Sequence, residues 1–312
     1  MRRIPGRRLG TLAGLAGLCV LLWILTPHFF TVSNLLNVLE QTSINAIIAA
    51  GMTFVIISAG IDLSVGSLVA VAGVVLAARL QAGASVWSAM IVALAVGFGF
   101  GILNGVAITL GRLPPFIATL GMMSIARGCA LLFTDGRPIS GFDASFRAIA
   151  TSRVAGIPSP VVITIVVYLV GHFVLARTRF GRYVYSIGGN EEATRLSGVD
   201  VRLHKTLIYG VSGLASAVAA VVLTARLNSA QPIAGIMYEL DAIAATVIGG
   251  ASLMGGEGGL GGTIIGALIM GVLRNGLNLL GVSSFVQQIV IGLVIVFAVL
   301  IDTSLKRMHS AE

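Results

Sequence analysis

Few residues in this chain have the types and spacing that chemistry requires. Residues 256–261 read GEGGLG and match the G-x-G-x-x-G pattern that binds dinucleotides. That pattern works only after a strand and with an acidic residue about 20 positions further on. Here it joins two apolar segments, and no acidic residue follows Glu257 before Asp302. We therefore interpret the match as accidental.

Other reactive motifs are missing from the sequence. It contains no P-loop G-x-x-x-x-G-K-[ST], no H-E-x-x-H zinc motif and no G-x-S-x-G nucleophile motif. The two cysteines, Cys19 and Cys129, lie in apolar runs without metal-ligand spacing, so we interpret them as small hydrophobic residues. We expect no enzyme activity, metal or cofactor on this chain alone.

Two carboxylates lie in glycine-containing turns between apolar segments, Asp62 within 58–67 and Glu257 within 255–262. An aspartate just before a helix accepts backbone N–H bonds and favours the positive end of the helix dipole. That capping role is one interpretation of each carboxylate. The other places each near a gate in a polar pathway.

Two arginines fall inside apolar segments. Arg127 lies twelve residues after Pro115, or about 18 Å along a helix that rises about 1.5 Å per residue. A charge at that depth in a bilayer costs roughly 3 kcal/mol or more and normally faces a bundle interior or water. Such an arginine either bonds backbone carbonyls or lines a polar pathway, and Arg274 presents the same choice. The candidates for a pathway or gate are Asp62, Asn104, Arg127, Glu257 and Asn275.

The most polar stretch, residues 177–205, contains six of the 20 Lys and Arg residues and three of the 12 acids. Within it, Asn190 is a good helix N-cap, two glutamates follow in the first turn, and Gly198 can end the helix. A helix this short is unstable alone, because isolated helices under about 12 residues are marginal in water. It must therefore dock on a partner or on the chain's own helices. Its candidate contact residues are Asn190, Glu191, Glu192, Ala193, Arg195, Leu196 and Gly198.

Composition shows what positions these residues. The chain is 56% hydrophobic and 10% charged, with a mean hydropathy of +1.00, whereas soluble domains are about 25% charged. Its 40 glycines have no collagen period and favour close packing of membrane helices. The net charge of +8 fits the excess of basic residues on cytoplasmic loops of membrane proteins, so we expect no nucleic-acid partner.

Apolar runs of about 20 residues predict an all-α integral membrane protein, a single transmembrane domain over 1–312. We expect a retained first span, because no small-residue cleavage site follows it, and a short interfacial helix at 34–40 behind a Ser33 cap. The ten expected spans are 9–26, 43–60, 66–83, 87–110, 115–134, 158–176, 206–225, 241–254, 262–281 and 284–302.

Basic residues predict the orientation. With both termini cytoplasmic, thirteen Lys and Arg residues lie inside and five outside. The turns at 58–67 and 255–262 are expected to be re-entrant. The segments GILNGVAITLG (101–111) and GVLRNGLNLLG (271–281) are alike, which indicates either an internal repeat, common in transporters, or only a shared glycine-rich composition.

The chain resembles the membrane permease subunits of bacterial ribose-type sugar ABC importers. The resemblance extends from about residue 30 to the end. It rests on AGMTFVIISAGIDLSVGSLVA (50–70), GILNGVAITLGRLPPFIATLGMMSIARG (101–128), TRFGRYVYSIGGNEEATRLSGVDV (178–201) and AATVIGGASLMGGEGGLGGTIIGALIMGVLRNGLNLLGV (244–282).

That resemblance implies a multi-pass protein of the bacterial inner membrane that forms a pore with a second permease, either an identical copy or a paralogue. It implies ABC ATPase subunits that bind ATP and Mg²⁺, and a periplasmic or lipoprotein sugar-binding protein. The 190–198 segment would correspond to the family's coupling helix. The alternative is a self-sufficient secondary transporter or channel for a small polar solute, which would need acids inside spans. Apart from the two re-entrant turns, no acid is expected at mid-span.

Overall fold

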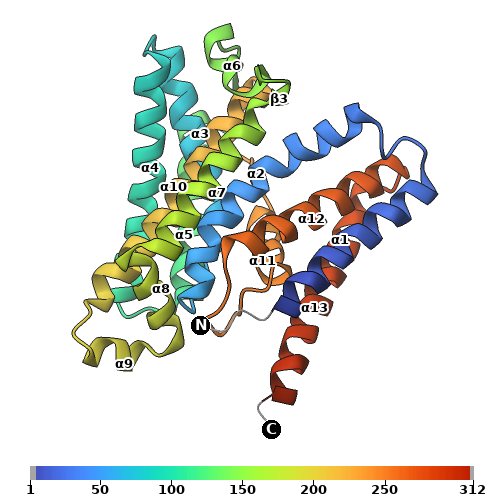
Figure 1. Ribbon diagram of the computed structural model, residues 1–312. Helices are drawn as coiled ribbons and strands as arrows, with labels where there is room; N and C mark the ends of the chain where they lie inside the picture. Colours follow the sequence, from blue (N-terminus) through green and yellow to red (C-terminus); the bar gives the residue numbers. More distant parts are fainter. Residues whose placement is uncertain (1–4, 310–312) are drawn as a thin grey trace.

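The computed structural model describes residues 5–309, which form helices joined by short connections (Figure 1). The only strands among these residues form two two-residue antiparallel pairs. The helices are α1 Pro5–Leu25, α2 Val32–Ile57, α3 Val65–Gln81, α4 Val86–Thr109, α5 Pro115–Thr134, α6 Ala144–Thr151, α7 Ser159–Arg177, α8 Arg179–Gly189, α9 Glu191–Leu196, α10 Val201–Leu227, α11 Tyr238–Ile248, α12 Leu260–Leu279 and α13 Ser284–His309. The strands are β1 Ile139–Ser140, β2 Arg153–Val154, β3 Ile157–Pro158 and β4 Ser229–Ala230.

Six helices are long and apolar enough to cross a membrane, namely α2, α4, α5, α7, α10 and α12. Three shorter apolar helices, Gly10–Leu25, Val65–Gln81 and Ser284–Phe297, coincide with other predicted spans. The chain is therefore an all-helical, multi-pass membrane protein. The count of ten spans and the cytoplasmic termini stay predictions, and the ends of the chain, 1–4 and 310–312, lie outside the described residues.

Three predicted boundaries were wrong. The 34–40 segment is not a separate helix, because α2 runs unbroken from Val32, and Thr31 rather than Ser33 is its N-cap. The predicted span 241–254 ends at Ile248, where Gly249 and Gly250 follow and Gly250 adopts a positive φ of 92°. The polar stretch 177–205 holds an additional helix, α8, and already enters α10 at Val201.

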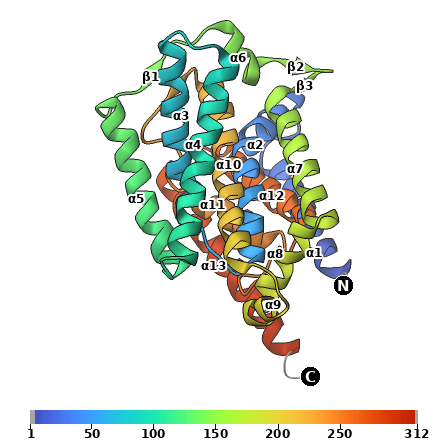
Figure 2. The same ribbon diagram turned by 90° about the vertical axis from the view of Figure 1, so that its left-hand side faces the viewer.

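Helix α2 lies at the centre of the molecule. It packs against α10 and α7, and also against α11 and α12. Around it, α3, α4, α5 and α10 form one group of helices, while α1, α11, α12 and α13 form a second (Figures 1 and 2). Most of α2 from Thr42 to Ile57 is buried for this reason. Polar residues on α2 are thus held between the two groups.

Glycines allow α4 and α10 to touch. Gly97, Gly101 and Gly105 are spaced four residues apart and so form one stripe on α4. A Cβ on Gly101 would lie 2.2 Å from the carbonyl oxygen of Tyr209 on α10, closer than real contacts allow. This is the close helix packing through small residues that the glycine content predicted.

The two ends of the molecule differ. At one end, β1 pairs with β4 and thereby joins the segment after α5 to the segment after α10. Helix α6 and the β2–β3 hairpin lie at this same end, while α9 lies at the opposite end (Figure 2). We call these the β end and the α9 end.

Candidate functional site

Asp62 and Asn104 belong to one buried hydrogen-bond network. Asp62 Oδ1 accepts from the backbone N–H of Ser64 at 3.0 Å and from its hydroxyl at 2.6 Å. Its Oδ2 accepts from the Ser212 hydroxyl on α10 at 2.8 Å, and Asn104 Nδ2 on α4 donates to Ser64 Oγ at 2.8 Å. Asp62, which is fully buried, therefore holds the start of α3 against α4 and α10. The bond to the Ser64 N–H, two residues further on, closes an Asx turn. The N-cap residue of α3 is Ser64, so the predicted capping role of Asp62 was wrong.

Arg127 bonds backbone carbonyls. Its Nη1 donates to the carbonyl oxygens of Pro232 and Ala234, each at 2.7 Å. Both carbonyls lie in the turn between β4 and α11, so this arginine attaches that turn to α5. The contact is the first of the two roles predicted for an arginine at this depth.

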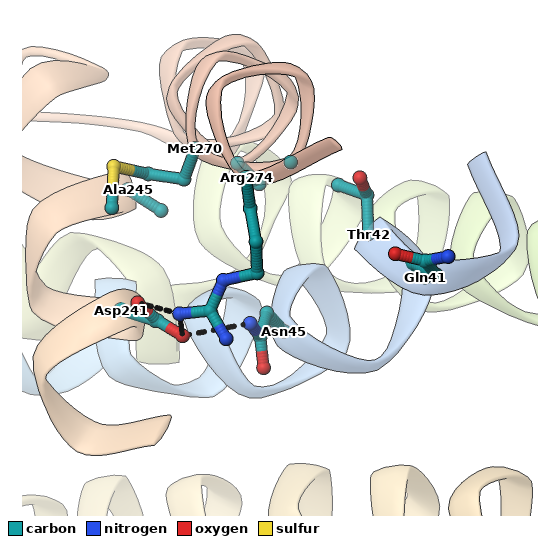
Figure 3. Close-up of a pocket in the computed structure, with 9 residues that line it drawn as sticks. Gln41, Thr42, Asn45, Asp241, Ala245, Met270 and Arg274 are labelled. Carbon is teal, nitrogen blue, oxygen red and sulfur yellow. Dashed lines mark hydrogen bonds and ion pairs between the residues drawn. The ribbon is translucent and has the colours of Figure 1, made fainter. Parts of the chain in front are cut away.

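Arg274 bonds a carboxylate, and the partner is one that sequence reasoning missed. Its Nη2 donates to the two oxygens of Asp241 at 3.0 and 2.7 Å (Figure 3). Asn45 Nδ2 donates a third hydrogen bond to Asp241, at 3.0 Å. The three residues come from α12, α11 and α2. An arginine inside a predicted span is a signal to look for an acidic partner, but Asp241 stood at the edge of the predicted span 241–254.

A small pocket adjoins this pair (Figure 3). Its volume is about 30 Å³. It is lined by Gln41, Thr42, Asn45, Asp241, Ala245, Ala267, Met270, Gly271 and Arg274. Asp241 is only 3% exposed, whereas the Arg274 side chain is 38% exposed. The charges therefore lie between α11 and α12 of the second group and face α2, with the arginine at the rim.

Asn275 and Glu257 are placed apart from one another. Asn275 and Asn34 exchange amide hydrogen bonds at 3.0 and 2.9 Å, which fix α12 to the first turn of α2. Glu257 is exposed, in the irregular segment 249–259. The same segment bonds its neighbours through its backbone: Gly256 N–H donates to the carbonyl of Ile57 at 2.8 Å, and Tyr185 Oη donates to that of Gly258 at 2.9 Å.

Helix α9 has the predicted ends. Asn190 Oδ1 accepts from the N–H of Ala193 at 2.9 Å, and Gly198 adopts a positive φ of 83° after the helix. Glu192 pairs with Arg195 within the helix, and Glu191 pairs with Lys205 of α10 at 2.8 Å. Thr194 is buried, whereas Leu196 is 78% exposed. One side of α9 thus packs on the chain, and Leu196 lies on the side that faces away.

The pathway candidates do not form one site. Asp62 and Asn104 share a network, while Arg127, Asn275 and Glu257 each bond or face different parts of the chain. Within residues 5–309, no group of three or more His, Cys, Asp or Glu residues could hold a metal ion. The polar groups instead join apolar helices to one another. Polar groups inside a membrane protein normally pair with one another or with backbone carbonyls in this way.

Comparison with known proteins identifies the kind of transport protein. Residues 34–299 match the family described as "Branched-chain amino acid transport system / permease component". The chain therefore belongs to this family of membrane permeases. No solved structure matches the chain.

Several curated relatives cover nearly the whole chain. It is 49% identical to the ribose import permease protein RbsC of Escherichia coli (strain K12), over 96% of this chain and 97% of that protein. It is 47% identical to RbsC of Bacillus subtilis (strain 168), over 95% and 92%. The D-allose transport system permease protein AlsC of E. coli (strain K12) is 39% identical, over 96% and 92%.

Proposed function

We propose that this protein is the pore-forming permease subunit of an ATP-driven importer for a monosaccharide or similar polyol in the bacterial inner membrane. The observation that carries the proposal is the 49% identity to a ribose import permease over almost the full length of both chains. A relative named for allose indicates that a sugar class, rather than one sugar, is shared. Ribose is the first substrate to test, because relatives named for ribose are 47–50% identical.

The proposal includes ten spans with both termini in the cytoplasm. The α9 end is then cytoplasmic, since it carries the basic stretch 177–205. The β end faces the periplasm, where a sugar-binding protein would deliver the solute. Two permeases, identical or paralogous, would enclose the pore, and lipid would contact the outer helices.

ATP and Mg²⁺ would bind to a separate ABC ATPase, and α9 is the contact we propose for it. The support is the exposure of Leu196 on a six-residue helix at the α9 end. A leucine in that position has neither lipid nor the chain's own helices to cover it. A groove on a cytoplasmic partner would cover Leu196, while Glu191, Glu192 and Arg195 at the rim would set orientation more than affinity.

Transport would follow from the ATPase cycle. The ATPase with bound ATP must favour one arrangement of the two permeases over the other, because a ligand shifts an equilibrium only by its difference in affinity for the two states. Helix α9 would carry that preference to the spans. The chain would itself hydrolyse nothing.

The test is reconstitution of the permease with its ATPase and sugar-binding protein in liposomes, with [¹⁴C]ribose uptake measured with and without ATP. Wild-type uptake should require ATP. Leu196→Asp should insert normally but lose both copurification of the ATPase and sugar-stimulated ATP hydrolysis, because the groove would bury an unpaired carboxylate. Val154→Asp, a change at an exposed apolar residue of the β end, is the matched control and should keep the ATPase bound.

If Leu196→Asp still bound the ATPase and imported ribose normally, α9 would not be the coupling element. It would then pack only on the other helices of this chain. Uptake by the wild type without any ATPase would favour the second candidate, a secondary transporter. One observation supports that candidate: Asp241 is a buried acid among the spans. Its pairing with Arg274 argues against a free ion-binding carboxylate.

A further inference from the structure

The pocket between α2, α11 and α12 has unused hydrogen-bonding capacity. Thr42 Oγ1 and Asn45 Oδ1 are both buried and have no hydrogen-bond partner. Buried polar atoms without partners are rare in folded proteins, and each calls for an explanation such as a bound molecule. Here two such residues line the same pocket.

The orientation of the Asn45 amide follows from its neighbour. The Asp241 carboxylate only accepts hydrogen bonds, so the amide nitrogen of Asn45 must face it. The amide oxygen therefore points away from Asp241 (Figure 3). Thr42 lies opposite Gly271, where a Cβ would come within 1.8 Å of the threonine hydroxyl. The Thr42 hydroxyl therefore packs against the backbone of α12 at Gly271, where only a glycine fits.

The charge of the pocket selects a neutral ligand. Arg274 and Asp241 cancel one another, and the carboxylate already accepts three hydrogen bonds from Arg274 and Asn45. An anion or a cation would therefore find no unpaired charge. The two buried groups without a partner are an amide acceptor and a hydroxyl that both donates and accepts, which together suit another hydroxyl. The volume of about 30 Å³ holds a group of that size, since a water needs roughly 10–15 Å³ of such space.

The position of the pocket indicates where such a hydroxyl would come from. Asn45 stands near the middle of the 26-residue α2, about 20 Å from either end at about 1.5 Å per residue. The Arg274 side chain is 38% exposed beside it, and Gln41 is exposed at the same rim. A guanidinium held by Asp241 at this depth would be unfavourable against lipid, so it faces water or protein.

We propose that this pocket is a subsite of the transport pathway, which receives one hydroxyl group of the polyol through Thr42 and Asn45. The proposal rests on the proposed function. The pocket is too small for a whole sugar, so the rest of the solute lies outside it, past Gln41 and Arg274. In the absence of solute, water fills the same place.

The test compares Thr42→Val with the wild type in the reconstituted complex, using ribose and the set of deoxy analogues that removes each of its hydroxyls in turn. For each sugar, the measured quantity is the ratio of uptake by the variant to uptake by the wild type. Both permeases receive the same loaded binding protein, so the selectivity of that protein cancels in the ratio. Loss of one neutral hydrogen bond predicts a roughly fivefold fall in uptake of ribose at low concentration. Uptake of one analogue, the one that lacks the contacted hydroxyl, should not change. Thr42→Ser should restore ribose uptake.

Thr53→Val is the matched control on the same helix. Thr53 already bonds the carbonyl of Ala49 and the hydroxyl of Thr263, so any loss should be equal for ribose and for every analogue. If Thr42→Val lowered uptake equally for all the sugars, or did not lower it, the subsite proposal would be overturned and the pocket would hold only a bound water. Failure of the wild type to import ribose would overturn the proposed function as well, and the two results are distinguishable.

A labelling experiment covers the case in which Thr42→Val does not insert. Thr42→Cys is made with Cys19 and Cys129 replaced by serine, because both native cysteines are free. A small water-soluble thiol reagent should modify position 42 in the assembled complex during ATP turnover, and ribose should slow the modification. Absence of modification, or modification that ribose does not affect, would overturn the proposal.

Discussion

At the residue scale, two arginines in apolar surroundings are stabilised in different ways. Arg127 bonds two carbonyls of a turn, while Arg274 bonds the carboxylate of Asp241. The sequence was enough to locate both arginines inside apolar segments and to predict bonding to backbone carbonyls as one possible role of Arg127. It did not allow the pair with Asp241 to be found, because that contact joins residues 33 positions apart across two helices and an irregular segment. The cap at Asn190 was predictable because all its parts lie within nine residues.

Arg127→Met should loosen the turn between β4 and α11. Hydrogen bonds from a charged group contribute about 1.5–3 kcal/mol each, and two carbonyls would lose them. We expect a lower midpoint of thermal aggregation in detergent and faster proteolysis near Pro232. If the variant had wild-type stability but abnormal uptake, Arg127 would instead be assigned to the transport pathway.

The pair of Asp241 and Arg274 should behave as a unit. Arg274→Leu leaves an almost fully buried carboxylate, and removing one partner of a buried pair costs about 3–5 kcal/mol. Replacing both residues by leucine should recover much of the loss in membrane abundance, since no charge then remains. A double variant as poor as the sum of the single variants would show that the two side chains act separately.

At the element scale, helix positions followed from apolar length, whereas several boundaries required local detail. The glycines after Ile248 and the unbroken start of α2 are examples. The amphipathic α8 was missed because its residues read as part of a polar loop. Glycine stripes indicated close packing, but only the structure pairs Gly101 with Tyr209.

Gly101→Ala should separate α4 from α10. Its Cβ would lie 2.2 Å from a backbone oxygen, and overpacking of this kind costs about 1–3 kcal/mol. Gly99 has open space on the same helix, so Gly99→Ala is the control and should be neutral or slightly stabilising. Thermal aggregation of both purified variants measures the difference. Equal midpoints would mean that the helices accommodate the methyl group by shifting.

At the scale of the whole molecule, composition and resemblance predicted a multi-pass permease, and the family match confirms it. The division of the helices around α2 was not predictable, because every span is apolar and hydropathy does not distinguish neighbours. Orientation remains a prediction from basic residues. A reporter fused within 177–205 should read as cytoplasmic, and one within 135–153 as periplasmic. A periplasmic signal from 177–205 would reverse the orientation and remove α9 from reach of an ATPase.

The junction beside α9 has a mechanical consequence. Near the end of α8, which leads directly into α9, Gly188 lies against the carbonyl of Ile57, where a Cβ would come within 1.8 Å. Gly255 and Gly256, from the segment after α11, pack on Gly188 as well. Three segments therefore meet backbone to backbone, with no side chain between them to change rotamer and absorb a displacement. If α9 is the contact for the ATPase, such a close-packed joint would transmit a displacement with little loss. A displacement of α9 would then reach Ile57 at the end of α2, the helix that also carries Thr42 and Asn45. Stroke length at the ATPase would then set the movement available at the solute, with little lost to compliance in between.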